Sequence, residues 1–97
     1  MKLDQKNIEL IKAYLQDKPV NRAYLFGSFV RGEAGPDSDV DILVELDYRN
    51  PIGLLFIRME QDLARILNRK VDLVSAQGMS KYLKPVIDQE KQLIYAR

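Results

Sequence analysis

The feature that most constrains the fold is a run of residues, 38–46, in which acidic and apolar side chains alternate. A period of two is typical of a β-strand, whose successive side chains point to opposite faces. One face would carry Val40, Ile42, Val44 and Leu46, and the other would carry Asp39, Asp41, Leu43 and Glu45. Because two aspartates lead directly into an apolar stretch, we expect them at the end of a buried strand, where open α/β sheets bind their ligands.

Strand and helix patterns alternate along the rest of the chain. Helices are expected after an N-cap at Asp4, from Pro51 to about Asn68, and from Ser80, the last of them bent or restarted at Pro85. Strands are expected over residues 20–26, 39–46, 70–75 and 92–96, with a short turn or helix at 29–33. This order predicts the α/β (α+β) class, with a small mixed sheet flanked by helices. The length of 97 residues fits one domain spanning 1–97.

The composition narrows the available chemistry. The chain contains no histidine and no cysteine, which excludes a Ser-His-Asp triad, a cysteine nucleophile and imidazole or thiolate metal sites. Its 15 basic and 14 acidic residues give a net charge of +1, so we expect no direct nucleic-acid binding. No apolar run approaches a membrane span, and residues 1–10 lack the apolar core of a signal peptide. We therefore expect a cytoplasmic protein without membrane contact.

Asp39 and Asp41 are the first candidate site residues. On a strand their side chains point to the same side, with Cα atoms ~6.8 Å apart. Two carboxylates this close repel each other unless a cation neutralises them or one takes up a proton. Oxygen ligands favour hard cations, which predicts Mg²⁺ or Mn²⁺ at these residues. A solvated acidic face is the more common role of an isolated Asp-x-Asp, and for these two residues alone that alternative stays open.

A Gly-Ser turn, Gly27-Ser28, ends the strand predicted over 20–26. A glycine lets the backbone approach a ligand, and the amides of the turn with the serine hydroxyl suit a phosphate oxygen. Arg31 adds a guanidinium that could hold a phosphate. Gly-Ser alone is a common turn. Gly-Ser followed after ten residues by Asp-x-Asp, however, would occur by chance in on the order of one chain of this length in a thousand.

A third carboxylate, Asp72, lies in the strand predicted over 70–75, 31 residues after Asp41. That interval is about the length of one β-α-β unit, which would place this strand beside the one that carries Asp41. Asp72 would then be a further metal ligand or the base that takes a proton from an attacking hydroxyl. The competing interpretation is an exposed aspartate on an edge strand.

Gly27-Ser28, ten intervening residues and Asp39-Val40-Asp41 resemble the signature of the DNA polymerase beta-like nucleotidyltransferase superfamily. Residues 27–34, 38–44 and 70–74 are similar to the corresponding stretches of the minimal nucleotidyltransferase (MNT) antitoxins. The resemblance implies the polymerase beta-like nucleotidyltransferase fold. Every motif position is intact, so the sequence contains nothing that predicts an inactive enzyme.

The resemblance also implies the roles of individual residues. In that family the first two aspartates bind Mg²⁺, the Gly-Ser turn holds the nucleotide triphosphate, and a third acidic residue completes the site. In this chain the corresponding residues are Asp39 and Asp41, Gly27 and Ser28, and Asp72.

MNT proteins are commonly paired with a HEPN-domain RNase toxin, and several transfer AMP from ATP to a tyrosine of that toxin. The resemblance therefore implies a protein adenylyltransferase that uses ATP with two Mg²⁺ ions, or Mn²⁺, and neutralises a HEPN toxin. A chain of 97 residues has little room for an acceptor domain, which favours a protein as acceptor. Two alternatives remain: an antitoxin that acts by binding alone, and a module that binds nucleotide without turnover.

Overall fold

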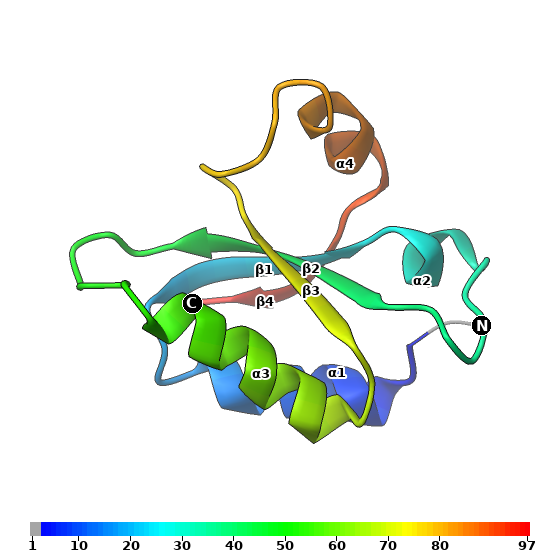
Figure 1. The fold of residues 1–97 in the computed structure, drawn as a ribbon, viewed down its shortest axis with the longest axis horizontal. Coiled ribbons are helices and arrows are strands. Elements are labelled where there is room, and N and C mark those ends of the chain that lie inside the picture. Colours follow the sequence, from blue (N-terminus) through cyan, green and yellow to red (C-terminus); the bar gives the residue numbers. More distant parts are fainter. Residues whose placement is uncertain (1–2) are drawn as a thin grey trace.

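A four-stranded sheet runs through the centre of the molecule in the computed structural model, which describes residues 3–97 (Figure 1). The strands are β1 (Val20–Phe26), β2 (Val40–Leu46), β3 (Val71–Ser75) and β4 (Gln92–Ala96). They lie in the order β3-β2-β1-β4. β1 pairs antiparallel with both β2 and β4, whereas β3 is parallel to β2. The predicted fold class, a small mixed sheet flanked by helices, is confirmed.

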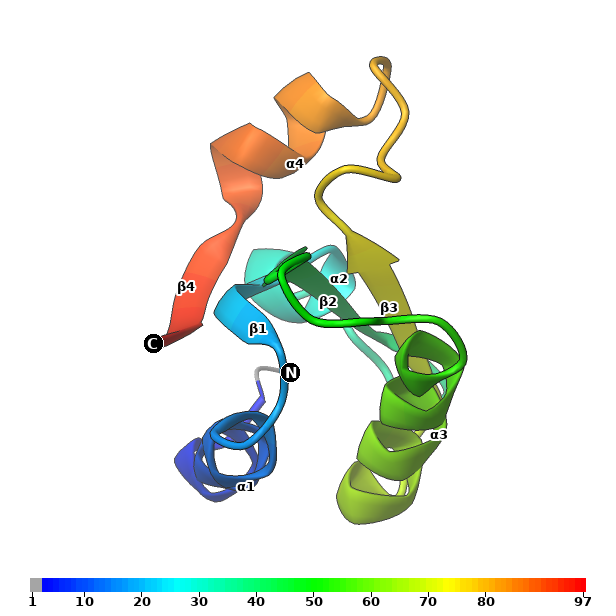
Figure 2. The same cartoon turned by 90° about the vertical axis from the view of Figure 1, so that its left-hand side faces the viewer.

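Helices lie on both sides of this sheet. They are α1 (Gln5–Leu15), α2 (Ser28–Arg31), α3 (Leu55–Leu67) and α4 (Lys84–Glu90). Figures 1 and 2 show α1 and α3 together on one face of the sheet and α4 on the opposite side, with α2 following the end of β1. No helix within residues 3–97 is long and apolar enough to cross a bilayer.

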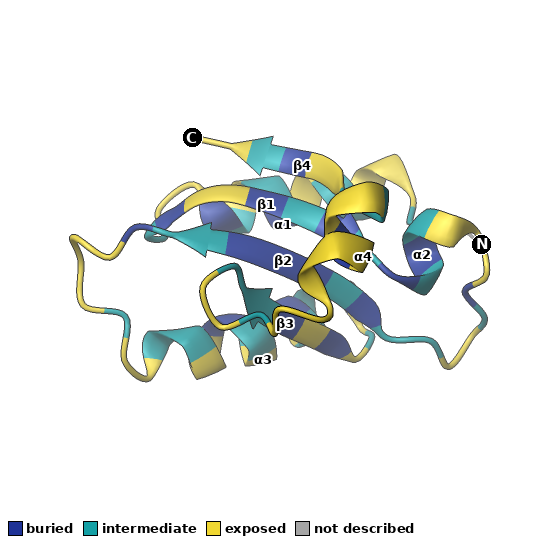
Figure 3. Cartoon of the chain, turned by 90° about the horizontal axis from the view of Figure 1, so that it is seen from above, coloured by how far each residue is buried: buried dark blue, intermediate teal, exposed yellow. Residues whose placement is uncertain are grey.

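The main core lies between the sheet and the layer formed by α1 and α3. Fully buried side chains of both helices belong there to one cluster with those of β2: Ile11, Leu15, Met59, Leu63, Val40, Ile42 and Val44. The face of β2 that begins with Asp41 points the other way, toward α4, because successive side chains of a strand alternate. Figure 3 shows that α4 itself is largely exposed. The alternation in residues 39–46 thus separates a packed face from the face that holds the aspartates.

The long helix begins later than the sequence predicted. We expected its start at Pro51, but α3 begins at Leu55. Gly53 has a φ of 46°, outside the right-handed helical region. The Leu55 amide donates a hydrogen bond to the Ile52 carbonyl at 2.9 Å, which closes a turn ahead of the helix. The proline therefore lies in an irregular segment that leads into α3.

A side-chain cap begins α1, whereas α4 has no such cap and has a proline in its first turn. Asp4 caps α1 as predicted, because its Oδ1 accepts a hydrogen bond from the Asn7 amide at 2.9 Å. Ser80 begins only a turn, and the regular helix α4 starts at Lys84. Pro85 lies in the first turn of α4, where the missing N–H group has no helical partner to lose. The predicted restart at this proline is confirmed.

Candidate active site

The end of the sheet at which β2 begins brings several predicted site residues together. Parallel pairing of β2 with β3 sets Asp41 opposite Asp72, as the β-α-β spacing predicted. Antiparallel pairing with β1 sets Asp41 opposite Phe26, so Gly27 follows directly and Ser28 begins α2. Two segments that are distant from each other in the sequence, the end of β1 and the start of β3, therefore converge on Asp41.

Gly27 lies so close to Asp41 that a larger residue would not fit without rearrangement. A Cβ at residue 27 would overlap Oδ2 of Asp41 and would lie 3.1 Å from its Cγ. The φ of Gly27 is 78°, a value that residues with a side chain rarely adopt. Its carbonyl accepts hydrogen bonds from the amides of Val30 at 3.0 Å and Arg31 at 3.1 Å. The glycine predicted to admit a phosphate thus also makes room for the Asp41 carboxylate.

The Asp41 carboxyl lies in surroundings that disfavour its charged form. Its pKa is raised from 3.8 to about 6, first by burial and then by the negative charges of Asp72 and Asp39. Glu90 acts in the same direction, and Arg31 acts against it. A cation bound at this position would relieve the repulsion between the carboxylates. The electrostatics of Asp41 therefore favour a cation site at this end of the sheet.

The other two predicted metal ligands, Asp39 and Asp72, are both accessible to solvent. Asp39 Oδ2 lies 3.9 Å from Lys70 Nζ, and its side chain, 39% exposed, lines a separate pocket of about 280 Å³. Asp72 is exposed on the edge strand β3, as the competing interpretation of the sequence described. Within residues 3–97, no three acidic side chains stand close enough together to hold one ion as they are placed. The structure thus places Asp41 and Asp72 beside Gly27 and leaves Asp39 facing Lys70.

Glu90, the last residue of α4, contacts the site although the sequence did not single it out. Its Oε1 accepts hydrogen bonds from the Gly27 amide at 2.9 Å and from Arg31 Nη1 at 3.1 Å, and its Oε2 lies 3.0 Å from the same Nη1. Arg31 Nε also donates to Glu33 at 2.7 Å. Helical spacing could have indicated Glu90, because it follows the buried Ile87 by three residues and so lies on the same face of α4.

A pocket of about 440 Å³ opens beside these groups. Its charged and backbone polar groups come from Gly27, Arg31, Asp72 and Glu90. Most of the remaining lining is apolar, from Phe26, Val74, Met79, Leu83, Val86 and Ile87. Small-molecule sites commonly combine a largely apolar lining with a few convergent polar groups, and this pocket has both.

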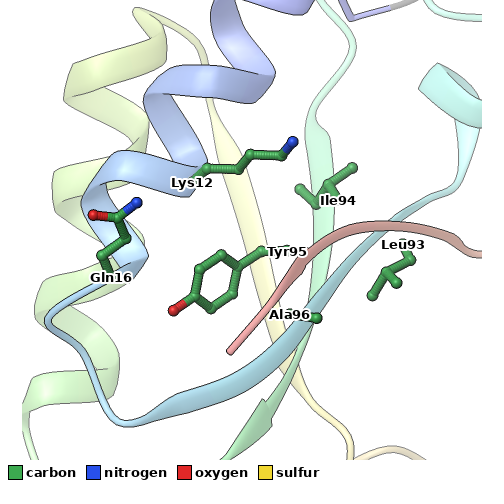
Figure 4. A pocket seen from close by; sticks show the side chains of 6 residues that line it. All are labelled: Lys12, Gln16, Leu93, Ile94, Tyr95 and Ala96. Atoms are coloured by element: carbon green, nitrogen blue, oxygen red, sulfur yellow. The ribbon is translucent and has the colours of Figure 1, made fainter.

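A second pocket, of about 400 Å³, lies between α1 and β4 (Figure 4). It is lined by Lys12, Gln16 and residues 93–96, and the sequence predicted none of these as site residues. Lys12 is the one charged side chain in this lining, which contains no carboxylate. Because a hard cation needs oxygen ligands of that kind, the pocket beside Gly27 is the candidate active site.

A mixed sheet with aspartates paired on neighbouring strands beside a glycine turn is the arrangement that the resemblance to nucleotidyltransferases implied. Comparison with known proteins agrees with it. The chain belongs to the nucleotidyltransferase domain family, whose model matches residues 8–94. Its enzyme class, nucleotidyltransferase, is therefore confirmed.

Individual relatives narrow the class to minimal nucleotidyltransferases. A candidate protein adenylyltransferase of Methanocaldococcus jannaschii is 39% identical over 87 residues, which are 87% of this chain and 85% of that protein. A toxin–antitoxin crystal structure with AMP-PNP contains a chain that matches with a TM-score of 0.81 at 27% identity, over 94% of this chain and 74% of that one. A complex of the tri-AMPylated HEPN toxin of Shewanella oneidensis with its MNT antitoxin contains another, with a TM-score of 0.75 at 25% identity, over 98% of this chain and 74% of that one. The predicted polymerase beta-like fold and the resemblance to the MNT family are confirmed.

Proposed function

We propose that this chain transfers AMP from Mg–ATP to a tyrosine hydroxyl of a partner HEPN-domain toxin and thereby neutralises the toxin. The observation that carries the proposal is the convergence of Asp41, Asp72 and Gly27 beside a pocket of about 440 Å³. The similar structures support the substrate and the partner, because one contains AMP-PNP and another contains an AMPylated HEPN toxin. We place the exchange in the cytoplasm, with no part taken by a membrane or by nucleic acid.

The donor groups fit Mg²⁺, with Mn²⁺ as the other suitable hard cation. Asp39, Asp41 and Asp72 offer carboxylate oxygens, which such ions prefer. The pKa of Asp41, raised to about 6 by burial and by its acidic neighbours, indicates a repulsion that a cation would relieve. Asp39 would exchange its contact with Lys70 for the ion. Held by these carboxylates, two Mg²⁺ ions would neutralise phosphate charge and lower the pKa of the acceptor hydroxyl.

The chain's own residues would position the nucleotide and accept a proton. The Gly27 amide and the Arg31 guanidinium line the pocket and are donors for phosphate oxygens, with Ser28 directly after Gly27. Transfer forms a bond between the tyrosine oxygen and the α-phosphorus and breaks the bond to the β-phosphate, so pyrophosphate leaves. The tyrosine proton would pass to the Asp72 carboxylate, which is exposed on an edge strand and accessible to an incoming hydroxyl.

The test is co-expression of a HEPN toxin partner with the wild-type chain or with the Asp39→Asn plus Asp41→Asn variant, followed by measurement of the intact toxin mass. We expect added AMP and normal growth with the wild-type chain, and an unmodified, active toxin with the variant. Asp37→Asn is the matched control, because Asp37 is an exposed aspartate just before the pair. If the variant neutralises the toxin as well as wild type, and the toxin gains AMP with neither chain, neutralisation by binding alone replaces the proposal.

A further inference from the structure

Glu90 occupies the groups that the proposed function assigns to phosphate. Its carboxylate accepts hydrogen bonds from the Gly27 amide at 2.9 Å and from Arg31 Nη1 at 3.1 and 3.0 Å. A phosphate oxygen would use the same two donors, because carboxylate and phosphate oxygens accept charge-assisted hydrogen bonds in the same way. The carboxylate and a bound phosphate would therefore compete for one position.

The surroundings of Glu90 differ from those of an ordinary surface ion pair. Its side chain is 18% exposed, less than half the 44% of its partner Arg31. It borders the candidate pocket together with Asp72, and its negative charge opposes ionisation of the Asp41 carboxyl. Because Asp41 and Asp72 lie nearby and are also acidic, the hydrogen bonds from the Gly27 amide and the Arg31 guanidinium are what hold the Glu90 carboxylate in place. A polyphosphate would take up these same donors.

We propose that Glu90 is a specificity-determining residue of the nucleotide site. Its carboxylate fills the anion position at Gly27 and Arg31 and yields it only to a more highly charged ligand, a nucleoside triphosphate or another polyphosphate. This inference rests on the proposed function, since it requires that the triphosphate binds at Gly27. Glu90 is the last residue of α4 and has a flexible side chain, so it can leave the position by changing rotamer.

A positioning role for the same contact makes the opposite prediction. In that case Glu90 would hold the Gly27 amide and the Arg31 guanidinium ready for the nucleotide, and removal of its carboxylate would weaken binding. Competition predicts instead that removal of the carboxylate tightens binding. The sign of the change in affinity therefore decides between the two roles.

The test is a calorimetric titration of the full chain with Mg–ATP and, separately, with inorganic tripolyphosphate in the absence of metal. Glu90→Ala removes the competing group, and Glu90→Gln keeps its shape while removing its charge. Glu33→Gln is the matched control, because Glu33 accepts a hydrogen bond from Arg31 at 2.7 Å but is exposed and does not line the pocket. We expect tripolyphosphate to bind about tenfold more tightly to Glu90→Ala and about threefold more tightly to Glu90→Gln, with a change below about twofold for Glu33→Gln.

Unchanged or weaker binding by the Glu90 variants would overturn the inference, and Glu90→Gln decides the matter if Glu90→Ala does not fold. The proposed function can fail separately. If Glu90→Ala binds tripolyphosphate more tightly but the wild-type chain transfers no AMP to the toxin, the role of Glu90 is supported and the proposed adenylyltransferase activity is contradicted. If the wild-type chain transfers AMP and both Glu90 variants bind with unchanged affinities, only the proposed role of Glu90 is contradicted. If neither Mg–ATP nor tripolyphosphate binds to any of the chains, both the proposed function and the role of Glu90 are overturned.

Discussion

Asp41 and Asp47 lie near the two ends of strand β2, and their carboxylates have opposite electrostatic surroundings. Asp41 is the second residue of the strand, and its pKa is raised to about 6 by burial and by neighbouring acidic groups. Asp47, directly after the strand, is only 4% exposed. Hydrogen bonds from Arg49 and Arg97 hold its pKa well below the usual range. The two contacts to its Oδ2, from Arg49 Nη2 and Arg97 Nη1, are 2.9 and 3.0 Å long.

The difference separates a carboxylate that stabilises the fold from one that is available to a ligand. Asp47 joins the end of β2 to Arg97, whose guanidinium also donates to the Lys18 carbonyl at 2.9 Å. Asp41 instead lies among other carboxylates, a costly arrangement that is typical of functional sites. We therefore expect substitution of Asp41 to change activity and substitution of Asp47 to change stability.

The largest effect is expected from the Asp39→Asn plus Asp41→Asn variant. AMP transfer to the toxin should fall by more than about 10⁴-fold, because neutral amides would not hold the proposed cations. The unfolding temperature should stay near that of wild type or rise, since the variant removes repulsion between carboxylates. Transfer kinetics and thermal unfolding on the same preparations measure both effects. Transfer within about tenfold of wild type would contradict the metal assignment.

Asp72→Asn should have the next largest effect on activity. We expect turnover to fall by about 10²–10⁴-fold, the range for a positioned base, with a smaller change in ATP affinity. The reason is that Asp72 lies on a different strand from the Asp-x-Asp pair and is accessible from solvent. Single-turnover kinetics together with ATP titration separate the two quantities. Normal turnover would make Asp72 an ordinary exposed residue of an edge strand.

At the other end of β2, Asp47→Asn should change stability and leave the chemistry intact. The asparagine amide carries no charge, so Arg49 and Arg97 would lose the buried anion to which both donate hydrogen bonds. We expect the unfolding temperature to fall by about 5 °C or more, with turnover within about twofold of wild type well below that temperature. Differential scanning calorimetry measures the first quantity. An unfolding temperature equal to that of wild type would show that the Asp47 contacts add no net stability.

The smallest predicted effect is on the pH dependence of stability. Because the pKa of Asp41 is about 6 in the folded chain and 3.8 for an ordinary aspartate, the folded state favours the protonated form. The stability from this group is fully present below about pH 4 and is lost as the pH rises through about 6. Asp41→Asn lacks this loss, so between about pH 4.5 and 7.5 wild type should lose about 1 kcal/mol relative to the variant, after allowance for screening by water. Urea unfolding of both chains measures the difference, which would be equal at both pH values if the pKa were ordinary.

Most of the fold could be predicted because the local signals agree with the tertiary structure. Period-two alternation and turn residues indicated all four strands, and the interval between Asp41 and Asp72 indicated their pairing. The start of α3 was predicted wrongly. Proline is common at the first position of a helix, which is why the helix was expected to begin at Pro51. The positive φ of Gly53 is not helical, and the helix begins only at Leu55. The backbone conformation of a glycine depends on its tertiary surroundings and is not visible in a local pattern.

The candidate site was less predictable than the fold because part of it comes from distant segments. The sequence identified Gly27 and Asp41 as candidates, but not that a Cβ on the first would overlap the carboxylate of the second. Arg31 was predicted to face phosphate, whereas its guanidinium is paired with Glu90, 59 residues away. The sequence does not single out Glu90, because charged residues of both signs surround it as they do on a solvated helix face. Contacts of this kind depend on the tertiary structure, which brings the end of α4 beside Gly27 and Arg31.

Calorimetric titration with Mg–ATP compares the two ends of β2 most directly. The chains are wild type, the Asp39→Asn plus Asp41→Asn variant and Asp47→Asn, each at a temperature well below its unfolding transition. We predict that wild type and Asp47→Asn bind with affinities within about twofold of each other, and that the double variant loses at least about tenfold in affinity. Equal affinities in all three chains, or an equal loss in both variants, would contradict a cation–nucleotide site at the Asp41 end of the strand.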